Sequence, residues 1–182
     1  MLTDRSMRLL ATFLLLLPPF AWAQGFVNSA NHVQVSGYLS RSAARPGDRL
    51  AAAVILEIQK GFHVNAHQPS LEYLIPTTLS LEAREGIAPG PVQYPKALVK
   101  KFGFADQPLK VYEGRTVLRF DLEVDSKAAV APSALKGKVR VQACDQKSCY
   151  APANIAVSIR VPMAAKGAAV EPTHVEIFRP SR

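Results

Sequence analysis

Two cysteines are the residues of this chain best suited to chemistry. Cys144 and Cys149 are its only cysteines, and four residues separate them. Such a pair can form a structural disulfide, form a redox-active disulfide that exchanges with other thiols, or contribute to a metal site. Two things help to choose among these three kinds of site: the strands that carry the two cysteines and the residues around them.

The cysteines lie between two predicted strands. Residues 138–143 and 155–161 each alternate apolar and polar side chains, which is typical of half-buried strands. If the two strands form a hairpin, the cysteines lie at its open end. Opposed Cα atoms about 4.5 Å apart can be bridged there. In this alternation Cys144 shares the polar face with Gln142, which predicts a reachable sulfur unless a bulge intervenes.

The first 23 residues have the three parts of a secretory signal peptide. Arg5 and Arg8 precede an apolar run over 9–17, and Ala21-Trp22-Ala23 supplies a small-x-small cleavage site. We therefore expect cleavage after Ala23 and an exported, soluble protein.

The remaining residues divide into one domain and a tail. Residues 24–162 suffice for one domain with a substantial core. Residues 163–182 are rich in Ala, Gly and Pro, which predicts a flexible tail.

The net charge of +8 is scattered along the chain, which gives little support for nucleic-acid binding. No apolar run after the first 23 residues is long enough to span a membrane.

The residues alone leave the structural and the redox interpretation of the pair open. Structural disulfides are common in exported proteins. A disulfide that closes so short a loop, however, adds only about 2 kcal/mol of stability, and a domain of this size does not need a disulfide in order to fold. Lys147, between the cysteines, can favour a thiolate and lower a thiol pKa.

A metal site is the third interpretation. His63 and His67 are the only close histidine pair, and two cysteines with two histidines form a known zinc ligand set. The cysteine spacing differs from that of a zinc knuckle, and export favours oxidised sulfur. We therefore expect no metal, with His63 a polar residue near a strand end and His67 a loop residue.

The rest of the chain predicts an all-β fold. About seven short strands separated by turns indicate an immunoglobulin-like antiparallel β-sandwich. The apolar run over 50–58 suits a central strand, although its pattern also fits a buried helix. Residues 85–111 are rich in Pro, Gly and Lys and are expected to form one long connection of functional importance. The other predicted strands are 33–39, 77–81 and 117–125.

Five short segments occur in a characteristic order along the chain. They are Gly-Phe-His-Val-Asn-Ala (61–66), Leu-Ile-Pro-Thr (74–77), Tyr-Pro-Lys (94–96), Val-Tyr-Glu-Gly (111–114) and the cysteine segment (142–152). Together they resemble the N-terminal periplasmic domain of the thiol:disulfide interchange protein DsbD, over about residues 30–162.

The resemblance implies an immunoglobulin-like sandwich whose two cysteines are the active site, without a metal or organic cofactor. By position, Cys149 resembles the cysteine that attacks a partner disulfide, and Cys144 the one that resolves the mixed disulfide. The family shields its cysteines with a cap loop that carries an aromatic residue. Phe102 and Phe104 lie in the matching stretch, with Phe104 the better candidate and core packing the alternative for both. The other expected neighbours of the cysteines are His63, Asn65, Lys147 and Tyr150.

The resemblance also implies partners and a location. A periplasmic domain of this kind takes electrons from a membrane-embedded thiol reductant. It passes them to disulfide isomerases and to thioredoxin-like proteins, including those of cytochrome c maturation, as a component of a protein-disulfide reductase. The chain departs from the pattern of the family in two ways. It has four residues between the cysteines, where the best-studied members have five. It also consists of a single module, which implies that a separate membrane protein acts as its reductant. The alternative is a non-catalytic immunoglobulin-like binding module with a structural disulfide.

Overall fold

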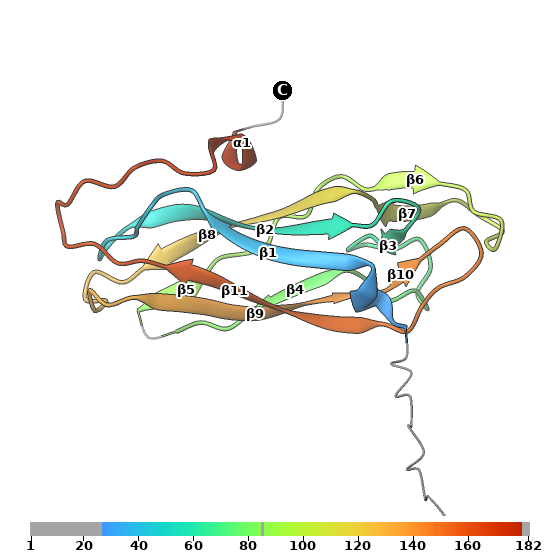
Figure 1. Ribbon diagram of the computed structural model, residues 1–182, viewed down its shortest axis with the longest axis horizontal. Coiled ribbons are helices and arrows are strands. Elements are labelled where there is room, and N and C mark those ends of the chain that lie inside the picture. The colour runs from blue at the N-terminus through green and yellow to red at the C-terminus, as the bar shows by residue number, and fades with distance from the viewer. Residues whose placement is uncertain (1–26, 85, 180–182) are drawn as a thin grey trace, which may run out of the picture.

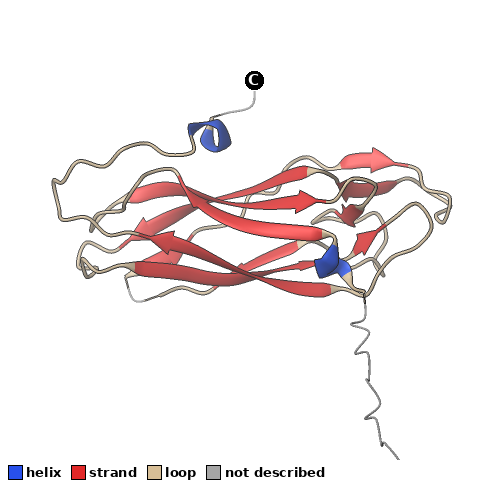
Figure 2. Cartoon of the chain, in the orientation of Figure 1, coloured by secondary structure: helices blue, strands red, loops and turns tan. Residues whose placement is uncertain are grey.

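The computed structural model describes residues 27–84 and 86–179, and over these it is built almost entirely of antiparallel strands (Figures 1 and 2). The signal peptide predicted over residues 1–23 lies outside the described residues. Within the described part of the chain, no helix is both long and apolar enough to cross a membrane.

The first layer is a four-stranded sheet in the order β1-β2-β8-β5. Its strands are β1 (Val33–Leu39), β2 (Arg49–Ile58), β8 (Arg115–Val124) and β5 (Ile87–Pro89). Along β8 every second residue is buried, as the alternation of apolar and charged side chains predicts. The apolar run at 50–58 is a strand, β2, rather than a helix, and it is buried on both faces.

The second layer is a three-stranded sheet in the order β11-β9-β4. Its strands are β11 (Ala153–Val161), β9 (Ser133–Val141) and β4 (Thr78–Leu81). β9 and β11 pair along their whole length, from Ala153 opposite Val141 to Val161 opposite Ser133, so the predicted hairpin is confirmed. Apolar side chains of both layers, among them Leu118, Phe120 and Leu135, fill one core between the sheets. The immunoglobulin-like sandwich is thereby confirmed.

A third, smaller sheet lies at one end of the sandwich, on the right in Figure 1. Its order is β10-β3-β7-β6, from β10 (Ala143–Cys144), β3 (His63–Asn65), β7 (Leu109–Tyr112) and β6 (Leu98–Lys100). A short 3-10 helix, η1 (Ser29–Asn31), packs beside it. This end of the molecule carries the cysteines.

The prediction of one long connection over residues 85–111 is wrong. That stretch contains β5, β6 and the start of β7, and the described residues hold eleven strands rather than about seven. Strands of three or four residues are too short to show a period of two, so the pattern does not detect them.

Residues 163–179, which composition suggests are flexible, make specific contacts with the first sheet. The short helix α1 (Val175–Phe178) buries Ile177 against Ala53 and Ile55, on the face of β2 that points away from the core. The guanidinium of Arg119 donates two hydrogen bonds to the carbonyl oxygen of Ile177, at 3.1 and 2.8 Å. This segment explains how β2 is covered on its second face.

Candidate functional site

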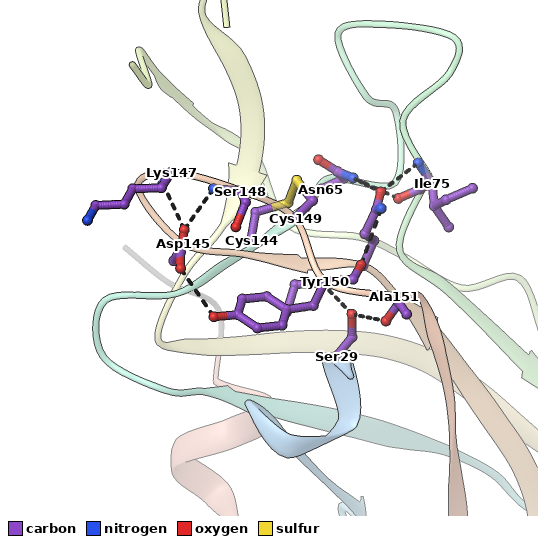
Figure 3. Close-up of a disulfide and its surroundings, with 12 residues drawn as sticks. Ser29, Asn65, Ile75, Cys144, Asp145, Lys147, Ser148, Cys149, Tyr150 and Ala151 are labelled. Atoms are coloured by element: carbon purple, nitrogen blue, oxygen red, sulfur yellow. Dashed lines mark hydrogen bonds between the residues drawn. A yellow bond between two sulfur atoms is a disulfide. The ribbon is translucent and has the colours of Figure 1, made fainter. Parts of the chain in front are cut away.

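The two cysteines form a disulfide, and their surroundings differ sharply (Figure 3). Their Cα atoms are 3.9 Å apart. Cys144 ends β10 and is 1% exposed, whereas Cys149 lies in the loop beyond it and is exposed. Cys149 therefore offers the accessible end of the bond.

The prediction that Cys144 lies on the polar face is wrong. Gln142 belongs to neither strand and separates β9 from β10, so the alternation shifts by one residue. Ala143 and Cys144 are consequently both buried. The interruption at Gln142 acts like a β-bulge and moves Cys144 from the polar face to the buried face.

Hydrogen bonds within the cysteine loop hold its shape. The Asp145 carboxylate accepts bonds from the backbone N–H groups of Lys147, at 2.7 Å, and Ser148, at 2.8 Å. The Asp145 N–H donates to the Ser148 carbonyl at 2.9 Å. The two accepted N–H bonds are the main cause that lowers the pKa of Asp145 below its ordinary value. None of these bonds needs the disulfide.

Two side-chain amides, the buried Asn65 and the partly buried Gln142, connect the cysteine segment to the rest of the domain. The side-chain N–H₂ of Asn65 donates to the Gln142 side-chain oxygen at 3.2 Å and to the Ile75 carbonyl at 3.1 Å. Gln142 in turn donates to the Tyr150 carbonyl at 3.4 Å. Asn65 is thus hydrogen-bonded to Gln142, two residues before Cys144, and Gln142 is a contact that the sequence pattern did not reveal.

Ser29 is a second anchor that sequence reasoning missed. Its hydroxyl accepts a hydrogen bond from the Ala143 N–H at 2.8 Å and donates one to the Ala151 carbonyl at 2.7 Å. It therefore ties together the chain before and after the disulfide (Figure 3). A lone serine more than a hundred residues upstream gives no local signal for this contact.

His63 lies directly opposite Cys144 in the pairing of β3 with β10. It is 1% exposed, and its ring stacks on Phe102 with centroids 3.9 Å apart and planes 18° from parallel. Burial is the main cause that lowers the pKa of His63 below its ordinary value. His63 is the aromatic neighbour of the buried cysteine.

Phe102 and Phe104 lie in the loop between β6 and β7 and have different surroundings. Phe102 is 3% exposed and packs with Leu74, Leu109 and Val111. Phe104 is 37% exposed, and its ring centroid is 5.6 Å from that of Phe102. Phe102 thus has a core-packing role, and Phe104 is the more accessible of the two rings.

Tyr150 belongs to an aromatic group, which the sequence did not reveal, with one residue just after η1 and one just before β3. Its ring centroid is 4.8 Å from His32 and 5.7 Å from Phe62, and those two rings stack at 3.8 Å. Its hydroxyl donates to Asp145 at 3.2 Å, and desolvation together with this bond raises the pKa of Tyr150. Tyr150 thereby fixes the outgoing end of the cysteine loop.

The remaining predicted residues contribute less. The Lys147 side chain is exposed and extends away from the disulfide (Figure 3), so its contact with the loop is through its backbone N–H. His67 stacks on Tyr94 with centroids 3.7 Å apart, and its Nδ1 lies 3.1 Å from the Thr77 carbonyl oxygen. Across residues 27–84 and 86–179, no group of three or more His, Cys, Asp or Glu side chains is arranged to hold a metal.

Two solved structures show likeness to the chain at low identity. The N-terminal periplasmic domain of ScsB from Proteus mirabilis matches at 13% identity with a TM-score of 0.48, covering 72% of this chain and 46% of that one. A family 123 glycoside hydrolase from Clostridium perfringens matches at 13% identity with a TM-score of 0.30, covering 73% and 28%. The chain spans less than half of either structure.

Comparison with curated protein sequences finds no match. The family described as the N-terminal domain of the thiol:disulfide interchange protein DsbD matches residues 34–160, well over half of the chain. The matched range covers all the strands except the first residue of β1 and the last residue of β11, and it contains the two cysteines. The chain therefore belongs to the family of DsbD N-terminal domains.

Proposed function

We propose that this chain is a periplasmic thiol–disulfide exchange module that works through Cys144 and Cys149. The observation that carries the proposal is the contrast between the two residues: Cys149 is exposed, and Cys144 is buried and bonded to it. Exchange needs one sulfur that a partner can approach and a second that can release the partner. Membership of the DsbD N-terminal family supports the same assignment.

The chemistry needs only sulfur. In the reduced domain, the Cys149 thiolate attacks one sulfur of a partner disulfide, and the other partner sulfur leaves as a thiolate and takes up a proton. Cys144 then loses its proton and attacks Cys149, which re-forms the domain's disulfide and releases the second partner thiolate. Two electrons pass from the domain to the partner, so no metal or organic cofactor is required.

The proposed partners are one protein that donates electrons to the domain and others that accept electrons from it. A membrane-embedded thiol reductant restores the Cys144–Cys149 dithiol, and thioredoxin-like or disulfide-isomerase proteins, including those of cytochrome c maturation, receive the electrons. The predicted signal peptide and the membership of the DsbD N-terminal family support a periplasmic location.

We propose that Phe104 restricts access to the disulfide from its own side, beside the exposed Cys149, until a partner docks. It is exposed, and it lies at the outer end of an aromatic stack that runs through Phe102 to His63, the residue opposite Cys144. Movement of the loop over residues 101–108 would widen access to the disulfide, of which Cys144 is the buried end.

A second candidate function is a binding module whose disulfide is structural. The burial of Cys144 favours it, because an inaccessible sulfur is typical of inert bridges. Mild reductant separates the two functions: a structural bridge resists it, whereas a redox pair opens readily with little loss of fold.

Trapping tests the exchange function directly. The variant Cys144→Ala retains the attacking sulfur but lacks the resolving one, so it should accumulate covalent adducts with periplasmic proteins that dithiothreitol releases. Cys149→Ala is the matched control and should form few adducts, since its remaining cysteine is buried. Absence of adducts from Cys144→Ala, together with a disulfide that glutathione and thioredoxin-type reductants fail to open, would reject the exchange function.

A further inference from the structure

His63 and Cys144 are paired across two neighbouring strands. They are the opposed residues of the β3–β10 ladder, and both are 1% exposed. Directly opposed side chains project from the same face of a sheet, with Cβ atoms about 4.5–5.5 Å apart. The ladder therefore places the two side chains on one face of the small sheet, and both are buried there.

The His63 ring is held in place by stacking, but its nitrogens make no hydrogen bond within the described part of the chain. Neither Nδ1 nor Nε2 has a hydrogen-bond partner among the described residues, although the ring is buried. Stacking on Phe102 fixes the orientation of the ring and leaves both nitrogens free. A buried polar group without a partner is costly, and in native proteins it calls for an explanation such as a catalytic role.

Cys144 is in turn a thiol that needs a base. Only the thiolate can attack a disulfide, and Cys144 is buried away from the water that could otherwise take its proton. The resolving step of the proposed exchange therefore requires a proton acceptor inside the protein, close to Cys144.

We propose that His63 is the general base of the resolving step, an inference that rests on the proposed exchange function. Neutral His63 takes the proton from the Cys144 thiol as that sulfur attacks Cys149. The bond between Cys149 and the partner sulfur breaks, and the partner sulfur leaves as a thiolate. His63 then passes the proton to that thiolate and returns to its neutral form, so electrons and protons balance.

The charges around His63 are compatible with a neutral base at physiological pH. Desolvation is the largest influence and lowers its pKa below 6.5. Glu113 and Asp145 act in the opposite direction and Lys100 acts with burial, while Lys100 and Glu113 also pair with each other. An imidazole with a pKa below its ordinary value is neutral at pH 7 and can accept a proton.

The test follows two thiol reactions of the reduced protein with dithiobis(nitrobenzoate). Attack by Cys149 releases one thionitrobenzoate, and resolution by Cys144 releases the second, so stopped-flow absorbance separates the steps. His63→Phe keeps an aromatic ring beside Phe102 but removes both nitrogens. The second phase should slow by about 100-fold at pH 7, within the usual range for a general base, while the first phase stays unchanged.

The pH profile distinguishes a base from a packing residue. In the unchanged protein the second phase should hold its rate down to below pH 6.5 and then fall as His63 becomes protonated. In His63→Phe it should instead rise steadily with pH, so that the two proteins converge in alkali. The matched control is His67→Phe, which removes a histidine that stacks on Tyr94, away from the cysteine pair, and should keep both phases.

Each outcome bears on one proposal. A normal first phase with an unaltered second phase in His63→Phe overturns the assignment of His63 and leaves exchange intact. A missing first phase in every protein overturns the exchange function itself. If His63→Phe melts at a much lower temperature, His63→Gln is measured in its place. In addition, if the rate of the second phase in the unchanged protein does not fall below pH 6.5, the assignment of His63 is overturned.

Discussion

The Tyr150 hydroxyl donates a hydrogen bond to the Asp145 carboxylate at 3.2 Å, and these two residues directly follow the two cysteines. The bond links the two ends of the cysteine loop and involves no sulfur atom. Asp145 also binds two backbone N–H groups inside the loop. None of these hydrogen bonds involves a sulfur atom, so we expect them to hold the cysteines near each other when the disulfide opens.

Reduction should accordingly leave the fold in place. A bridge across so short a loop contributes about 2 kcal/mol by chain entropy. In a domain of this size that corresponds to a fall in Tm of about 4–8 °C. Calorimetry of the oxidised and reduced protein measures the difference, and loss of cooperative unfolding on reduction would show that the bridge is structural.

The loop should depend on pH through Asp145. Its pKa in the folded protein is below the ordinary value of 3.8, so the carboxylate stabilises the loop fully above 3.8 and loses this effect as pH falls through the lowered pKa. Hydrogen exchange at the amides of Lys147 and Ser148 should be slow at pH 5 and speed up, relative to intrinsic exchange, under strong acid. Asp145→Ala should abolish this protection at every pH. Equal protection in that variant would contradict the assigned bonds.

The two phenylalanines of the loop over residues 101–108 should separate stability from access. Phe102→Ala removes a buried ring and should cost about 3–5 kcal/mol in urea unfolding. Phe104→Ala removes a partly exposed ring whose main aromatic contact is Phe102, and should cost only about 1 kcal/mol. If Phe104 shields the cysteines, its removal should also speed the first reaction with dithiobis(nitrobenzoate). An unchanged rate would remove Phe104 from that role.

Gly137 should tolerate no side chain, because β9 and β4 approach closely there. A Cβ would lie 2.4 Å from the backbone oxygen of Ser80, which cannot move without displacing β4. Gly137→Ala should therefore destabilise the domain by about 1–3 kcal/mol. Gly103→Ala is the control: nothing lies within 4 Å of its Cβ position, and its stability should change by about 0.5 kcal/mol or less.

The sequence predicts the long strands of the sandwich well, for a physical reason. β8 and β11 each have one face in the core and one outside it, so their apolar residues alternate. β5, β6 and β7 have three or four residues each and show no such period. The cysteine pair is predictable from residue type, and its family from the order of short motifs.

The details of the site depend on contacts between distant segments. The break at Gln142 coincides with hydrogen bonds of its side chain to Asn65 and Ile75, which lie far away in the chain. Local alternation therefore assigns Cys144 to the wrong face. The stacking of His63 on Phe102 likewise joins two segments that only the fold brings together.

The equilibrium reduction potential of the Cys144–Cys149 pair tests the central claim most directly. It is measured by equilibrating the protein with defined ratios of reduced and oxidised glutathione and trapping free thiols. The account predicts a value between about −180 and −270 mV, the interval from protein disulfide isomerase to thioredoxin. A value below about −300 mV, typical of structural bridges, would contradict it.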